Sequence, residues 1–205
     1  MIFLIAIIPA LCWGINPLLV GKINGHSENE MFGMGIGDGL IALIFWLFSQ
    51  PTVTISGVTF GLAMISGAAW AIGQLGQYIS YRLLGVSKTM PISTALQLVG
   101  TSLIGVLMFG EWGSSNQKIL GLLAIMLIVA GSALSAGTSD GRKKGFSCYL
   151  PLLMTTIGYW IYSCIPKLVK VDALQLFLPQ MLGILIVPVG WEIYHQPTVY
   201  LDKQR

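Results

Sequence analysis

The chain has 205 residues and a net charge of +3, and 55% of its residues are hydrophobic while only 9% are charged. An ordinary soluble domain carries about 25% charged residues, so this composition excludes a soluble globular protein and predicts an integral membrane protein. The slight basic excess is expected in cytoplasmic loops and does not indicate a nucleic-acid surface.

Seven apolar segments follow one another along the chain. A helix needs about 20 mostly apolar residues to cross a bilayer. The segments are Ile2–Val20, Phe32–Phe48, Thr59–Leu84, Thr89–Phe109, Ile119–Ala136, Leu150–Val169 and Leu174–Trp191. They are continuous and lack the alternation of barrel strands, so we predict an all-α polytopic membrane protein. The first segment has no basic flank and no clear cleavage site, and is predicted to stay as a membrane helix.

The predicted organisation has two units. Pro17 and Trp13 in the first helix correspond to Pro166 and Tyr162 in the sixth, which is typical of an inverted repeat. We therefore expect a first five-helix repeat over residues 1–137, a cytoplasmic connecting loop over 138–145, two helices of a second repeat over 146–192 and a polar tail over 193–205.

Basic residues set the expected orientation. With the N-terminus outside, the inner loops hold eight Lys and Arg residues and the outer loops hold three. Positive loops tend to remain in the cytoplasm. We expect a multi-pass protein of the cell membrane with the N-terminus outside and the loop 138–145 inside.

The third helix contains the stretch WAIGQLGQYISY, which is unusually polar for a membrane segment. At 100° per residue, its amide and aromatic side chains fall within an arc of roughly 100°. These residues are Trp70, Gln74, Gln77, Tyr78 and Tyr81. The opposite side is apolar, so we predict that the polar face points into the protein.

Other helices carry similar faces. The fourth helix aligns Ser93, Thr94, Gln97 and Thr101, the first aligns Trp13 and Asn16, and the sixth aligns Tyr159 and Tyr162. Amides and hydroxyls pair with ligand hydroxyls, while aromatic rings offer flat apolar platforms. A neutral polyhydroxyl ligand needs both. The predicted substrate-binding residues are Trp13, Asn16, Trp70, Gln74, Gln77, Tyr78, Ser93, Thr94, Gln97 and Thr101.

The alternative is that these polar groups only hold the helices together, as is common in membrane bundles. This alternative is the stronger one for a single Ser or Thr, and the weaker one for Gln74, Gln77 and Gln97 taken together.

Two acidic residues are candidates for coupling or gating. Asp38 lies within the second apolar segment, where a carboxylate is a functional hypothesis by default and could take up a coupling proton. Glu111 ends the fourth helix beside Trp112 and could act as a gate. Each could instead be an acid near the membrane surface that simply contacts water.

The sequence offers no enzyme machinery. It contains no HExxH, GxSxG or P-loop motif, and we expect neither catalysis nor a metal or other cofactor. Cys12, Cys148 and Cys164 show no metal-binding spacing and are predicted to be packing residues.

The segment Trp70 to Trp112, with GQLGQ, GVSKTMPIST and LQLVGTSL, resembles the glucose/ribose porter family of bacterial sugar-uptake proteins within the drug/metabolite transporter superfamily. IPALCWG near the start and LGLLAIMLIVAGSAL in the fifth helix fit the same family. The resemblance implies ten helices in two inverted halves and uptake of a glucose- or ribose-like monosaccharide, with a proton as coupling ion. Its matching positions are Trp13, Trp70, Gln74, Gln77, Pro91, Ser93, Thr94, Gln97, Thr101 and Glu111.

This chain departs from the family pattern in two ways. An acid stands at Asp38, where a small polar residue is expected. The chain also has about seven of the ten helices, which suggests C-terminal truncation. The expected function is monosaccharide symport by alternating access, with a homodimer or complementing helices as partners. The alternatives are an exporter of amino acids or other metabolites and an inactive remnant.

Overall fold

The computed structural model describes residues 2–20, 22, 25–49, 55–136 and 145–202. These residues form seven α-helices and one short 3-10 helix, and no strand occurs among them. The helices are α1 (Ile2–Val20), α2 (Ser27–Ser49), α3 (Gly57–Leu84), α4 (Val86–Phe109), α5 (Ser115–Ser135), α6 (Leu150–Val169), which follows the 3-10 turn η1 (Phe146–Tyr149), and α7 (Ala173–Asp202). The predicted all-α class is confirmed.

The predicted and observed helices differ mainly at their ends. Helix α2 begins at Ser27 because its first turn is acidic, and carboxylates stabilise a helix N-terminus although they are not apolar. Helix α5 begins at Ser115, where Ser114 and Gln117 form a capping box. Helix α7 continues to Asp202 through residues expected in the polar tail. The predicted connecting loop 138–145 lies outside the described residues except for Gly145.

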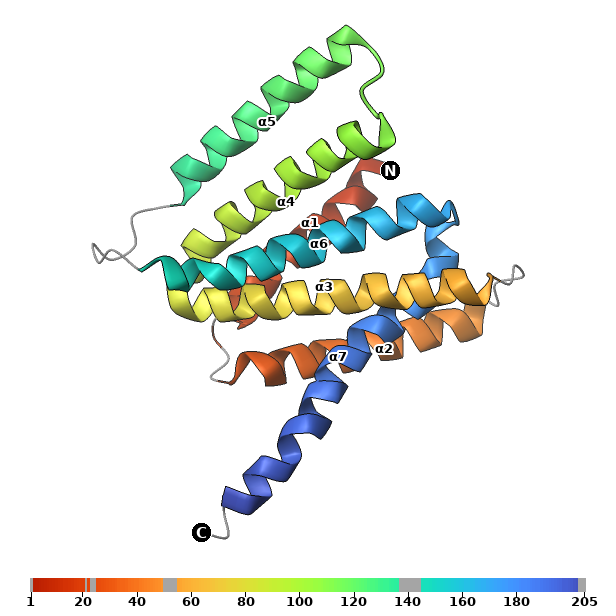
Figure 1. Ribbon diagram of the computed structural model, residues 1–205, viewed down its shortest axis with the longest axis vertical. Coiled ribbons are helices and arrows are strands. Elements are labelled where there is room, and N and C mark those ends of the chain that lie inside the picture. Colours follow the sequence, from red (N-terminus) through yellow and green to blue (C-terminus); the bar gives the residue numbers. More distant parts are fainter. Residues whose placement is uncertain (1, 21, 23–24, 50–54, 137–144, 203–205) are drawn as a thin grey trace.

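Helix α3 is the centre of the bundle. It packs along α6 and α7, while α2 packs on α7, and α4 lies between α5 and α6 (Figure 1). Small residues allow this close approach. A Cβ atom at Gly67 of α3 would overlap the backbone of Gln180 on α7, and a Cβ atom at Gly158 of α6 would overlap the backbone of Ala69 on α3. Helices of both predicted units therefore share one core.

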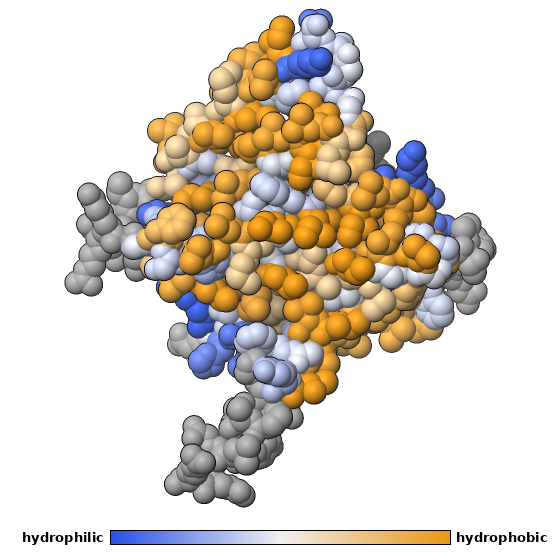
Figure 2. All heavy atoms as spheres, in the orientation of Figure 1, coloured by the Kyte–Doolittle hydropathy of each residue, from blue (hydrophilic) through white to orange (hydrophobic). Residues whose placement is uncertain are grey.

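The exterior is apolar. Figure 2 shows hydrophobic residues across most of one face, with hydrophilic residues mainly near the helix ends. None of the residues of α5 is buried, and Leu127 and Leu134 are 73% and 87% exposed. Six of the described helices are long and apolar enough to cross a membrane, and Ile7–Val20 of α1 is a shorter apolar stretch. Such a surface suits lipid, so this is a multi-pass membrane protein.

Candidate functional site

A cavity of about 520 Å³ lies between α1, α2, α3, α6 and α7. Its volume lies within the range of small-molecule sites, about 300 to 1,000 Å³. The lining is largely apolar and aromatic. It consists of Pro9, Trp13, Met34, Asp38, Ile41, Trp70, Tyr162, Phe177, Met181 and Ile184.

Among the residues that the structure describes, Asp38 is the only charged one in this lining. It lies near the middle of α2 and is half-buried. Its carboxylate forms no hydrogen bond or ion pair with any residue in the described part of the chain. Its charge acts on the hydroxyl of Tyr162. A carboxylate at this depth without a partner is available to a ligand or a proton.

Aromatic rings from four helices surround the same cavity. Trp13 is on α1, Trp70 on α3, Tyr162 on α6 and Phe177 on α7. The rings of Trp70 and Tyr162 are tilted, with centroids 6.4 Å apart. These rings offer flat apolar faces, and the indole N–H and phenol O–H groups add hydrogen-bonding capacity at their edges.

The glutamines of α3 lie elsewhere. Gln74 and Gln77 are 2% and 1% exposed, and both side-chain oxygens contact the hydroxyl of Tyr159 on α6, Gln77 at 2.6 Å. The hydroxyl has one proton and two lone pairs, so it donates to one amide and can accept from the other if that amide is turned round. These amides therefore connect α3 to α6, and neither lines the cavity.

Thioether sulfurs complete the buried network. The hydroxyl of Tyr78 donates to Sδ of Met34 at 3.1 Å, and the hydroxyl of Tyr81 donates to Sδ of Met90 at 2.9 Å. Gln77 donates from Nε2 to the same Met90 sulfur at 3.0 Å. The predicted residue Asn16 of α1 also interacts with the Tyr78 hydroxyl. The network thus joins α1, α2, α3 and α4 on one side of the cavity.

The predicted residues of α4 bond mainly to each other. Gln97 donates from Nε2 to Oγ of Ser93 at 2.9 Å, and the Thr101 hydroxyl donates to the Gln97 backbone oxygen at 2.7 Å. Ser93 is buried, whereas Thr94 is half-buried. None of the four residues lines the cavity.

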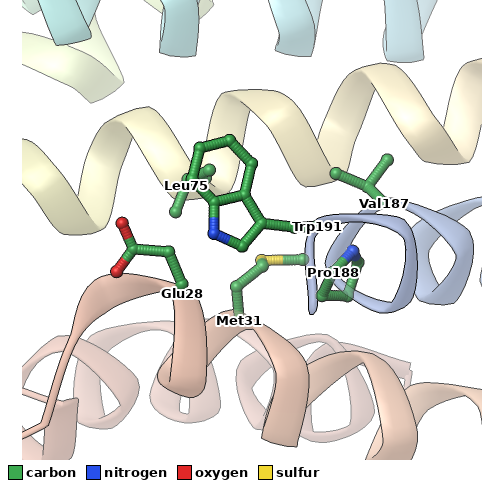
Figure 3. Close-up of a pocket in the computed structure, with 6 residues that line it drawn as sticks. All are labelled: Glu28, Met31, Leu75, Val187, Pro188 and Trp191. Carbon is green, nitrogen blue, oxygen red and sulfur yellow. The ribbon is translucent and has the colours of Figure 1, made fainter. Parts of the chain in front are cut away.

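An ion pair ties α3 to α2 at the end of the bundle where α3 finishes. Arg82 binds Glu30 at 2.6 Å and donates to Oγ of Ser27 at 2.8 Å. The Glu30 side chain is only 5% exposed. Beside it, Met31, Leu75 and Trp191 enclose a small pocket of about 20 Å³ (Figure 3). That volume holds about one water molecule, which is too small for a sugar.

The opposite end carries a second ion pair. Glu111, just beyond α4, binds Lys167 on the last turn of α6, and each side chain is 44% exposed. The Lys167 ammonium also lies 5.5 Å from the centre of the Phe109 ring. Glu111 is therefore a contact between α4 and α6 near the surface.

Of the twelve predicted ligand and coupling residues, the cavity brings together Trp13, Asp38 and Trp70. For all twelve residues, a ligand or coupling role stays a prediction. Tyr162 lines the cavity but was not among the predicted ligand residues, although it lies on the polar face of the sixth segment. Phe177, Met181 and Ile184 on α7 were missed because apolar residues in an apolar helix give no signal.

Among the side chains that the structure describes, no group of three or more His, Cys, Asp or Glu residues could hold a metal ion. The three cysteines are free.

Comparison with known proteins places the chain among transport proteins. The family described as "Sugar transport protein" matches residues 4–205. A "Putative sugar uptake protein" of Lactiplantibacillus plantarum is 98% identical over 204 residues, which are 100% of this chain and 72% of that protein. The "Putative ribose uptake protein RbsU" of Latilactobacillus sakei is 40% identical over 91% of this chain and 64% of its own length.

A further relative has a different sugar in its name. The "Probable glucose uptake protein GlcU" of Priestia megaterium is 38% identical over 94% of this chain and 69% of its own length. No significant match to a solved structure was found.

Proposed function

The chain belongs to the sugar transport protein family, and from this we propose that it takes up a monosaccharide across the cell membrane. The names of relatives support glucose-like or ribose-like sugars as the cargo. No catalytic step is part of this function, because the family is one of transporters.

The observation that carries the proposal is the cavity that contains Trp13, Trp70 and Asp38. The C–H faces of a sugar ring stack on aromatic rings, while its hydroxyls need donors and acceptors. The indole N–H groups, the Tyr162 hydroxyl and the Asp38 carboxylate supply these. The cavity of about 520 Å³ is large enough for one monosaccharide with water.

We infer transport by alternating access, in which α-helical units rock around this cavity. In this proposal the Arg82–Glu30 pair closes the Arg82 end of the bundle, whereas the Lys167 end carries the more exposed Lys167–Glu111 pair. The distribution of basic residues favours the Arg82 end as the cytoplasmic side and the N-terminus as outside. In this scheme the Arg82–Glu30 pair separates to release sugar into the cell.

Proton coupling is proposed through Asp38. The carboxylate lies in the cavity and no described residue bonds to it, so a proton taken up there would neutralise a charge that the bilayer disfavours. A protonated Asp38 and a bound sugar would then cross together. We propose that a second copy of the chain or further helices complete the site, because inverted-repeat transporters bind substrate between their two repeats.

The test is sugar binding and uptake by the purified chain in proteoliposomes. Trp70→Ala should abolish binding of radiolabelled glucose or ribose because it removes a ring from the cavity. Trp46→Ala is the matched control, since Trp46 is 44% exposed on α2 and is not in the lining. Equal sugar binding by the Trp70→Ala variant and the unmodified chain would refute the site.

A further inference from the structure

We propose that this cavity accepts monosaccharides that carry a protonated amino group, with the Asp38 carboxylate as the partner of the ammonium. The inference rests on the proposed sugar site and specifies its preferred substrate class. A sugar of this class would bring a positive charge into the cavity in place of the coupling proton.

The first step is the state of the charges inside the described bundle. Glu30 is paired with Arg82, and Glu111 is paired with Lys167. Asp38 has no such partner, and it lies near the middle of a membrane helix. A half-buried carboxylate without a partner in a membrane helix is costly, so the cavity favours an arriving cation.

The second step is the ring content of the cavity. Trp13, Trp70, Tyr162 and Phe177 come from four different helices and share this one space with Asp38. Aromatic faces attract ammonium groups, and tryptophan does so best. The same rings stack on the C–H faces of a sugar. An amino sugar uses the carboxylate and the rings together, whereas a neutral sugar uses the carboxylate only through hydroxyls.

The third step is what the lining lacks. No Lys, Arg or His belongs to the cavity in the part of the chain that the structure describes. An anionic sugar would find no cation there and would face the Asp38 carboxylate. We therefore expect the order amino sugar, then neutral sugar, then sugar acid.

The experiment measures competition with bound radiolabelled glucose on the purified chain at about pH 6.5, below the usual pKa of about 7.7 to 8.0 for an α-amino group. The competitors are glucosamine, 2-deoxyglucose and glucuronate. Glucosamine carries a protonated amine at the carbon where 2-deoxyglucose carries hydrogen. Glucuronate adds a carboxylate. Glucosamine should compete about tenfold better than 2-deoxyglucose, which corresponds to about 1.4 kcal/mol.

The readout is the ratio of the two affinities within each protein. In Asp38→Asn the ratio should fall severalfold toward one, with any remainder due to the rings. In Asp38→Glu it should stay close to the original value, because the charge is kept. Asp172→Asn is the control with an unchanged ratio, since Asp172 lies at the start of α7 and is not in the lining.

One expected result is a gain of binding, which a misfolded variant would not show. Asp38→Asn removes the repulsion of a sugar acid, so glucuronate should compete about tenfold better with this variant than with the unmodified chain. A misfolded variant could not gain affinity.

The outcomes separate the two proposals. If the unmodified chain binds none of the sugars, the sugar site itself is refuted. If it binds glucose but does not distinguish glucosamine from 2-deoxyglucose, the sugar site survives and the amino-sugar inference is overturned. A tenfold preference that persists in Asp38→Asn overturns it as well.

Discussion

The hydroxyl of Tyr159 on α6 lies 2.6 Å from the side-chain oxygen of Gln77 on α3, in a part of the bundle where both residues are almost fully buried. Gln74 contacts the same hydroxyl from one turn earlier. Two amides from an apolar stretch of the sequence thus share one phenol hydroxyl from a distant helix. This contact joins the predicted first unit to the predicted second unit.

We predict that Tyr159→Phe lowers the free energy of unfolding by about 1 to 3 kcal/mol, because it leaves buried amide groups without a partner. Thermal denaturation in detergent checks this. Tyr149→Phe is the matched control, since the Tyr149 hydroxyl makes no hydrogen bond among the described residues and only its ring contacts Lys88. An unchanged melting temperature for Tyr159→Phe would contradict a stabilising role for this contact.

We also predict that Gly67→Ala destabilises the bundle. The added Cβ atom would overlap the backbone of Gln180, so α3 and α7 must separate, and overpacking costs typically about 1 to 3 kcal/mol. Gly61→Ala is the control on the same helix, because nothing lies within 4 Å of a Cβ atom there. That variant should keep or slightly raise stability, since alanine favours helix. Equal melting temperatures in both variants would contradict the close packing.

The sequence predicted the helices well because each is a long apolar run, as in α6, where both ends agree. Most of the other predicted helix ends lay inside the observed helices. In a polar first turn such as Ser27–Glu30, the side chains interact favourably with the free backbone N–H groups of the helix end. A hydropathy pattern does not detect such a turn, because its residues are not apolar.

The site was harder to predict than the fold. Helical phase correctly put Trp70, Gln74 and Gln77 on one inward face of α3. It could not say which helix covers each part of that face. Trp70 lines the cavity, while the Tyr159 hydroxyl occupies the space in front of the two amides. Such an assignment depends on contacts 82 or more residues apart in the chain.

Removing Arg82 and removing Glu30 from their ion pair should lower the free energy of unfolding by different amounts. The Glu30 side chain is 5% exposed, whereas the Arg82 side chain is 42% exposed. Removing the arginine with Arg82→Leu leaves a buried carboxylate alone, which costs about 3 to 5 kcal/mol. Glu30→Gln leaves an arginine that can reach water and should cost less.

Thermal denaturation of both single variants and of the double variant tests this order. The double variant should be more stable than Arg82→Leu alone, because it no longer holds an unpaired buried charge. Glu111→Gln is the control at the other end. Its pair with Lys167 is 44% exposed on both sides, so its loss should cost at most about 1 kcal/mol. Equal losses for Arg82→Leu and Glu30→Gln would contradict the argument from burial.

The last prediction concerns opening at the Arg82 end and rests on the alternating-access proposal. Ser80 is fully buried on α3, two residues before Arg82, and a cysteine there should react slowly with a maleimide in a cysteine-free background. Adding Glu30→Gln should raise the labelling rate severalfold, because the closed end then opens more often. A cysteine at Ser66, which is fully buried toward the other end of α3, should stay unreactive. If both cysteines become reactive together, the variant has unfolded. If neither does, the ion pair does not control access.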